Sequence, residues 1–233
     1  MKKSCVVGLL IAVAALAGPT FATVIEDFES YSSGSWNPTG VNGWYQDGGN
    51  RQIGTSYGLT GKGLGMLDPG SGDVGIRWAQ PLSGAGDHYV KYNVDFGNIS
   101  GDSIVQILLR SGGSAIAKVS FFGSSMSAER VVGNGSGNTV ETLGGFSPGH
   151  WRTVEFDLDF TAHKYKVSYD GGAWTGYANF VNNVAATATQ DDYLFVRSAN
   201  ASFDGITHAV PEPATVGLLG LGSILAYYRR KNK

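Results

Sequence analysis

Cysteine and charged residues are both scarce in this sequence. The chain has 233 residues, of which one is Cys and 15% are charged, and its formal net charge is −2. Globular proteins usually carry about 25% charged residues, so this composition excludes a coiled coil, an acidic disordered tail and a Lys/Arg-rich nucleic-acid-binding protein. Because the single Cys5 lies within the first 22 residues, residues 23–233 have no disulfide and no thiol chemistry.

Motifs of several enzyme classes are missing as well. No G-x-S-x-G elbow occurs, which excludes the simplest α/β-hydrolase. The TGKG segment at 60–63 lacks the earlier Gly and the following Ser or Thr of a phosphate-binding loop. None of the four His has a second His or a cluster of acids at metal-ligand spacing, which argues against a zinc site: His88, His150, His163 and His208.

Residues 23 to about 208 show short apolar or alternating runs, separated by clusters of Gly, Asn, Asp and Ser. The chain has 35 Gly, which we assign to turns, and this region shows no helical period. The spacing predicts an all-β fold, an antiparallel β-sandwich formed by one domain over residues 23–209. The clearest expected strands are 89–96, 103–110, 115–122, 151–160, 164–169 and 193–197.

The segment 151–169 predicts a β-hairpin with one apolar and one charged face. Its first strand places four apolar side chains on one face: Val154, Phe156, Leu158 and Phe160. The opposite face carries three acids, which two lysines of the next strand can face: Glu155, Asp157, Asp159, Lys164 and Lys166. An Asp170-Gly171 turn ends the second strand. We therefore expect a solvated, charge-balanced outer face.

The N-terminal segment has the three parts of a secretory signal peptide. Lys2 and Lys3 precede an apolar run over residues 6–16, and small-residue cleavage sites occur at 15–17 and 20–22. We predict a signal peptide over residues 1–22 that is cleaved after Ala22, with cleavage after Ala17 as the alternative.

The C-terminal segment combines a Pro-Glu-Pro motif, an apolar stretch over 214–228 and a basic tail over 229–233. As a helix, the apolar stretch rises about 22 Å, which is short for a hydrocarbon layer of roughly 30 Å. The basic tail supplies a cytoplasmic stop. We therefore predict a short transmembrane helix that acts as a temporary anchor.

This arrangement resembles the PEP-CTERM sorting signal of Gram-negative bacteria over residues 210–233. The resemblance implies that an exosortase recognises and removes the signal, and it assigns five sorting residues: Pro211, Glu212, Pro213, Arg229 and Arg230. It also implies contact with the export machinery, a transient stay in the inner membrane, and release to the cell surface or an extracellular polysaccharide matrix. It implies no activity for residues 23–209.

Three segments of the expected domain resemble concanavalin A-like or laminin G-like jelly rolls: a DFE…Y…G…W opening, a HWRTVEFDLDF…YKVSYDGG hairpin and an FDGI close. Jelly-roll carbohydrate-binding modules of this kind commonly hold a structural Ca²⁺ between an acid of the first strand and an acid of the last. The resemblance implies Glu29 and Asp204 as ligands, with Asp27 behind them. The alternative, that these are ordinary acids at strand edges, stays open.

The acidic strand also resembles the E-x-D-x-E core of family 16 glycoside hydrolases, whose first Glu is the nucleophile and whose last is the acid. A retaining pair needs carboxyl groups about 5 to 5.5 Å apart, whereas positions i and i+4 of a regular strand lie about 13 Å apart. Here the third acid is the shorter Asp159, and lysines follow on the next strand. We predict no catalytic residue, and a glycan-active hydrolase or lyase stays as an alternative.

Exposed indole rings stack on sugars, and the expected domain contains five Trp: Trp36, Trp44, Trp78, Trp151 and Trp174. The Trp44-Tyr45 pair lies in a Gly/Asn-rich segment with the composition of a loop, and it is the predicted sugar platform. The alternative is that the Trp residues pack in the core.

We expect a non-catalytic surface or matrix protein associated with exopolysaccharide, with a carbohydrate-binding module containing structural calcium as the alternative. Residues 23–210 carry 11 basic and 18 acidic side chains, a net charge of −7 that the basic ends of the chain hide. Such a domain repels anionic polysaccharide at long range. Neutral sugars, cation bridging and protein contacts are therefore the expected interactions.

Overall fold

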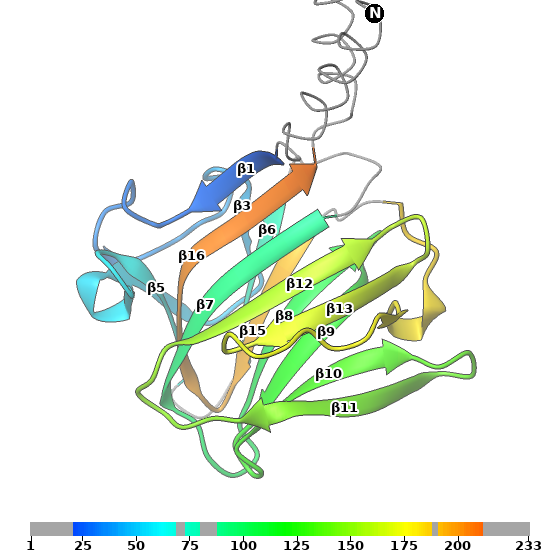
Figure 1. Ribbon diagram of the computed structural model, residues 1–233. Coiled ribbons are helices and arrows are strands. Elements are labelled where there is room, and N and C mark those ends of the chain that lie inside the picture. The colour runs from blue at the N-terminus through cyan, green and yellow to red at the C-terminus, as the bar shows by residue number, and fades with distance from the viewer. Residues whose placement is uncertain (1–20, 69–72, 80–87, 188–190, 212–233) are drawn as a thin grey trace, which may run out of the picture.

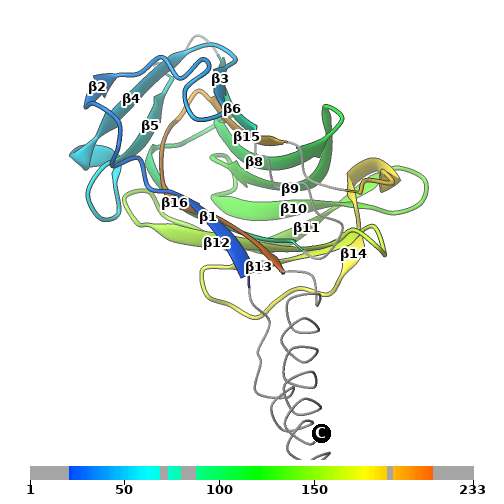
Figure 2. The same cartoon turned by 90° about the horizontal axis from the view of Figure 1, so that it is seen from above.

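The computed structural model describes residues 21–68, 73–79, 88–187 and 191–211, which form antiparallel β-strands and two 3-10 helices, η1 (Thr55–Tyr57) and η2 (Val181–Asn183) (Figure 1). The strands lie in two layers, seen from above in Figure 2. The predicted antiparallel β-sandwich is therefore confirmed.

Sheet I has this spatial order: β2 (Gly34–Ser35), β4 (Asn50–Gly54), β5 (Gly63–Leu67), β16 (Asn200–Pro211), β7 (His88–Asn98), β12 (Arg152–Asp159) and β13 (Lys164–Tyr169). In addition, β1 (Phe21–Glu26) pairs with β16. Sheet II has this order: β11 (Asn138–Gly145), β10 (Ser127–Gly133), β9 (Ser114–Phe122), β8 (Ile104–Ser111), β15 (Asp191–Arg197), β6 (Asp73–Ala79) and β3 (Trp44–Gln46). The short β14 (Ala178–Asn179) pairs with both β13 and β10, so it joins the two sheets at one edge.

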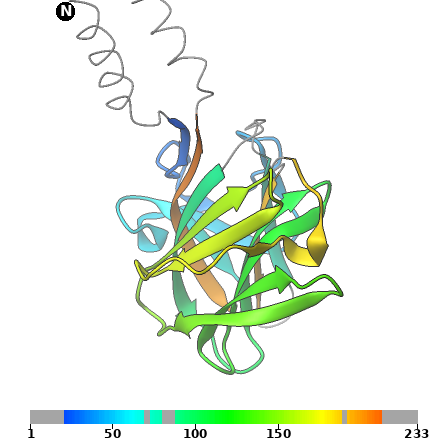
Figure 3. The ribbon, with the colours of Figure 1, turned by 45° about the vertical axis from the view of Figure 1, so that its right-hand side comes forward.

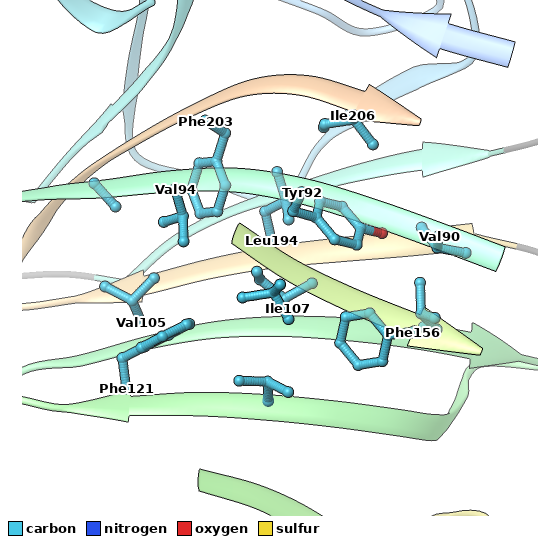
Figure 4. Close-up of a cluster of buried hydrophobic side chains, with 14 of the residues drawn as sticks. Val90, Tyr92, Val94, Val105, Ile107, Phe121, Phe156, Leu194, Phe203 and Ile206 are labelled. Carbon is cyan, nitrogen blue, oxygen red and sulfur yellow. The ribbon is translucent and has the colours of Figure 1, made fainter. Parts of the chain in front are cut away.

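The core lies between the two sheets, where apolar side chains from both inner faces interdigitate (Figure 4). Tyr92 and Val94 of β7 and Phe203 of β16 meet side chains of sheet II, namely Ile107, Phe121 and Leu194, and all six are fully buried. Buried and partly exposed residues alternate along β12 and β15. This is the pattern that a strand with one face on a core requires.

The predicted hairpin is present as β12 and β13. Asp157 lies opposite Lys166 and Asp159 opposite Lys164 in an unbroken register. The turn after β13 is the predicted one: Asp170 and Gly171 have φ values of 53° and 71°, and the N–H of Gly172 donates to the carbonyl of Tyr169 at 2.9 Å. Two consecutive positive φ values define the turn type that Asp-Gly favours.

The first and last described residues lie side by side, because Phe21 pairs with Pro211 and Ala22 with Val210. The predicted cleavage after Ala22 falls within β1, and Pro211 is the last residue of β16. The predicted helix over 214–228 and the sorting residues Glu212, Pro213, Arg229 and Arg230 lie outside the described residues. Within the part of the chain that the structure describes, no helix has the length and apolar character needed to cross a membrane.

Candidate functional site

The predicted sugar platform is divided between the core and the surface. Trp44 is fully buried: its Nε1 donates a 3.0 Å hydrogen bond to Glu26 Oε2, and its ring stacks on Trp78 with centroids 5.2 Å apart. The prediction of Trp44 as an exposed sugar contact is therefore wrong, because the indole packs into the core. Tyr45, the next residue of β3, is 44% exposed.

Two other exposed aromatic side chains lie close together on the segment between β13 and β14. Trp174 is 40% exposed and Tyr177 is 46% exposed, whereas the other four Trp are buried or partly buried. The segment turns back along β13 (Figure 3), where the N–H of Thr175 donates to the carbonyl of Val167 at 2.9 Å. This pairing carries both rings over the outer face of sheet I.

Lys166 of β13 fixes the position of the two rings. Its Nζ lies 5.1 Å from the ring centroid of Trp174 and 4.7 Å from that of Tyr177. The same ammonium forms a 2.9 Å ion pair with Asp157 Oδ2, which also accepts a 3.1 Å hydrogen bond from the Tyr177 hydroxyl. The hydrogen bond to Asp157 raises the pKa of Lys166, so the cation persists at neutral pH. We call these four residues the aromatic patch.

Tyr89 of β7 extends the aromatic patch along the sheet. Its ring lies edge-on to Trp174 with centroids 6.4 Å apart, and its hydroxyl donates to Glu155. Burial, together with the hydrogen bond to Glu155, raises the pKa of Tyr89, and burial likewise raises the pKa of Tyr177. Both phenols therefore stay protonated. Apolar ring faces beside fixed polar groups are what a sugar ring needs from a binding site.

The three acids of β12 are engaged separately. Glu155 accepts a hydrogen bond from Tyr89, Asp157 pairs with Lys166, and Asp159 Oδ1 accepts from the N–H of Ala162 at 2.7 Å. The register with β13 shows no bulge over this stretch. The strand is therefore not bent in the way that would bring its first and third carboxyl groups together as a retaining pair.

The two acids predicted to bind calcium both hold the loop that precedes β5. Glu29 Oε1 accepts a 2.6 Å hydrogen bond from the N–H of Lys62, and Asp204 Oδ2 accepts from the N–H groups of Leu59 and Thr60 at 2.8 and 3.2 Å. Burial raises the pKa of Asp204, while these N–H donors lower it. The Lys62 ammonium also donates to the carbonyl oxygens of Glu29 and Tyr31 at 2.9 and 2.8 Å.

This donor set fits a calcium ion poorly, because the carboxylate oxygens already face N–H groups and an ammonium lies beside the same loop. Among the described residues, no group of three or more His, Cys, Asp or Glu side chains could hold a metal ion. The calcium ion stays a prediction from the sequence. We expect the thermal unfolding midpoint to be the same with and without excess chelator, since the protein's own donors hold the loop. A fall of several degrees with chelator, reversed by Ca²⁺, would contradict this expectation.

Among the buried acids, Glu26 and Asp192 were not predicted from the sequence. Glu26 is 8% exposed and Asp192 is 1% exposed. Asp192 Oδ2 lies 2.6 Å from Nε2 of His208, which is equally buried, and accepts a hydrogen bond from Tyr92. The alternation of β15 contains the signal, because Asp192 shares the inward face with Leu194. Neither acid is accessible to a ligand, so we assign both to the stability of the fold.

Comparison with known proteins identifies one part of the chain. The family described as the PEP-CTERM protein-sorting motif matches residues 209–231. The chain carries a PEP-CTERM sorting motif. This confirms the resemblance of the C-terminal segment, and the motif implies an exported protein that is anchored transiently in the membrane and processed by exosortase before release to the surface.

Solved structures resemble this chain in fold but not in sequence. A sialidase is 14% identical with a TM-score of 0.59, and the match covers 80% of this chain but only 18% of the sialidase. The catalytic domain of a glycoside hydrolase family 131 protein from Coprinopsis cinerea is 13% identical with a TM-score of 0.53, covering 78% of this chain and 91% of that domain. At such identities the likeness shows the fold alone. No curated protein matches the chain significantly in sequence.

Proposed function

We propose that the chain is a non-catalytic polysaccharide-binding protein, exported by its signal peptide, released by exosortase and left at the cell surface or in the extracellular matrix of a Gram-negative bacterium. The sorting motif at 209–231 supports the route. The binding role is argued from the site, because one fold hosts many unrelated functions.

The aromatic patch is the observation that carries the proposal. Trp174 and Tyr177 expose 40% and 46% of their surface and lie together over Lys166, whereas apolar side chains that are exposed singly carry no such meaning. Neutral polysaccharide is the ligand that fits, because Asp157 and the neighbouring Glu155 accept hydrogen bonds from hydroxyl groups and repel carboxylates. Lys166 contributes N–H donors between the rings.

Substitution of Trp174 tests the proposal. We expect Trp174→Ala to weaken binding to a neutral polymer about tenfold or more, as loss of a central aromatic contact does elsewhere. The probes are amorphous cellulose, chitin and an insoluble β-1,3-glucan, and the readout is the fraction of protein that sediments with each polymer.

Tyr45→Ala is the matched control, since Tyr45 is exposed to the same degree but lies on β3 in the other sheet. It should bind like the wild type. Equal losses for Trp174→Ala and Tyr45→Ala, or no binding of the wild type to any of the three polymers, would reject the aromatic patch as a neutral-sugar site.

The same mixtures test the absence of catalysis. We expect no reducing ends to accumulate in the supernatants, because the acids of β12 form separate contacts along a straight strand. Sugar release that disappears in Glu155→Gln would instead favour the alternative of a glycan-active hydrolase or lyase.

A further inference from the structure

The outer face of sheet II carries a row of side chains unlike those of the aromatic patch. Arg77 of β6 lies beside Tyr193 of β15, which lies beside Leu108 of β8, which lies beside Lys118 of β9. All four side chains are partly buried. Because neighbouring strands lie about 4.8 Å apart, the row from Arg77 to Lys118 is about 14 Å long.

Several polar atoms of this face have no partner within the described residues. Lys118 Nζ forms no hydrogen bond or ion pair there, and burial lowers its pKa. Two further atoms are buried: Arg77 Nε donates no hydrogen bond, and Asp191 Oδ1 accepts none. The two buried atoms are out of reach of a ligand. The Lys118 ammonium is a donor of this face with no partner among the described residues, and the Arg77 and Asp191 side chains are 39% and 19% exposed, so their other polar atoms are open to a ligand.

Arg110 stands over the same face. Its guanidinium lies 5.2 Å from the ring centroid of Tyr193, and its Nε is 3.4 Å from Asp191 Oδ1, without the geometry of a hydrogen bond. Because Oδ1 is buried while the Asp191 side chain is 19% exposed, a ligand hydroxyl would reach the other carboxylate oxygen, Oδ2. Three cations, Arg77, Arg110 and Lys118, face two acids, Asp191 and Asp47, which gives the face a local charge of +1.

We propose that this face binds a polysaccharide that carries carboxylate groups, a polyuronate, independently of the aromatic patch. Ligand carboxylates would accept hydrogen bonds from Lys118 and Arg77, and a sugar hydroxyl would donate to Asp191. The apolar side chain of Leu108 lies between them and receives a sugar ring, beside the Tyr193 ring that Arg110 covers. Carboxylates, hydroxyls and an apolar ring face together match the cations, the acid and the apolar side chain of this face.

The net charge of −7 over residues 23–210 does not prevent this contact at physiological salt. The Debye length there is about 8 Å, so acids outside the face are largely screened from a ligand that lies on it. A nucleic acid is a poorer fit, because duplex DNA carries one charge per 1.7 Å or so and needs many more cations than the face offers.

Binding of the full chain, held in detergent, to immobilised polygalacturonate tests the proposal. The control ligand is the methyl ester of the same polymer, which keeps the sugar rings and removes the carboxylate charge. We expect the wild type to bind polygalacturonate at least tenfold more tightly than the ester, and Lys118→Gln to weaken polygalacturonate binding about tenfold. Lys118→Arg should bind like the wild type.

Lys164→Gln is the control variant, because it changes the net charge of the protein equally but lies exposed on β13 of sheet I. It should bind polygalacturonate like the wild type, as should Trp174→Ala. Equal losses for Lys118→Gln and Lys164→Gln, equal binding of the ester, or equal competition by duplex DNA would overturn the proposal. Loss of polyuronate binding in Trp174→Ala would place the ligand on the aromatic patch instead. A failure to bind neutral polymers would reject the proposed function and leave this inference standing.

Discussion

Asp192→Ala is expected to lower the free energy of unfolding by about 3 kcal/mol, because two buried hydrogen-bond partners lose their common acceptor. Asp192 and His208 are each 1% exposed and lie 2.6 Å apart, and Tyr92 donates to the same carboxylate oxygen. The substitution leaves the imidazole and the phenol in the core without their common acceptor. Burial and the charge of Asp192 raise the pKa of Tyr92, so the phenol keeps its proton and still needs an acceptor.

Urea unfolding followed by Trp fluorescence measures this effect, and at 2–4 °C per kcal/mol the thermal midpoint should fall by about 10 °C. Asp192→Asn should lose less, because one acceptor oxygen remains for His208 or Tyr92. Asp102→Ala, an exposed acid with no hydrogen bond among the described residues, should change stability by less than about 0.5 kcal/mol. If Asp192→Ala were as stable as Asp102→Ala, the buried pair would have no part in holding the sheets together.

The strands that could be predicted are those with one face in the core. The alternation in 151–160 and 193–197 follows directly from burial on one side, and β12 and β15 form there. β11 was not predicted, because it is an edge strand in which no residue is buried. Its sequence therefore shows no alternation of apolar and polar residues.

The candidate site was less predictable, because its residues are brought together by contacts distant in sequence. The neighbourhood of Trp44 has the composition of an exposed loop, yet Glu26 and Trp78 from β1 and β6 cover the indole. Trp174 has no distinguishing pattern in the sequence. Its position depends on the segment after β13 turning back along that strand, which a single sequence does not reveal.

The charged face of the hairpin was predicted correctly, and the structure gives one of its charges a second contact. A balanced row of acids and lysines was expected to be only a solvated face, and the register does place Asp157 opposite Lys166. The structure adds that the ammonium of this pair lies against two exposed rings. The same residues therefore form a solvated charged face and position an aromatic surface. The aromatic patch and the proposed polyuronate face lie on opposite sheets (Figure 2), so the two ligands would not compete.

Glu26→Ala is expected to lower the free energy of unfolding by about 3 kcal/mol, because three donors lose one acceptor. Glu26 Oε1 accepts from the N–H of Phe28 at 2.8 Å, and Oε2 accepts from the Tyr31 hydroxyl at 2.7 Å and from Trp44 Nε1 at 3.0 Å. Burial and the hydrogen bond to Glu26 raise the pKa of Tyr31, so its hydroxyl keeps its proton. Phe28 has a φ of 59°, which is costly for a residue other than Gly, and its hydrogen bond to Glu26 helps to hold it there.

Urea unfolding should show the loss, and the emission of Trp44 should shift toward that of a hydrated indole as the cover over it loosens. Glu26→Gln is the informative comparison, because it keeps the size of the side chain but turns one acceptor into a donor that faces the same N–H and O–H groups. We expect it to recover little of the lost stability. Recovery to the wild-type value would mean that packing, and not the carboxylate, attaches β1 and the chain after it to the core. β1 contains the predicted cleavage site and pairs with the end of β16. In that case this single acid would no longer explain how the start of the domain is fixed beside the sorting motif.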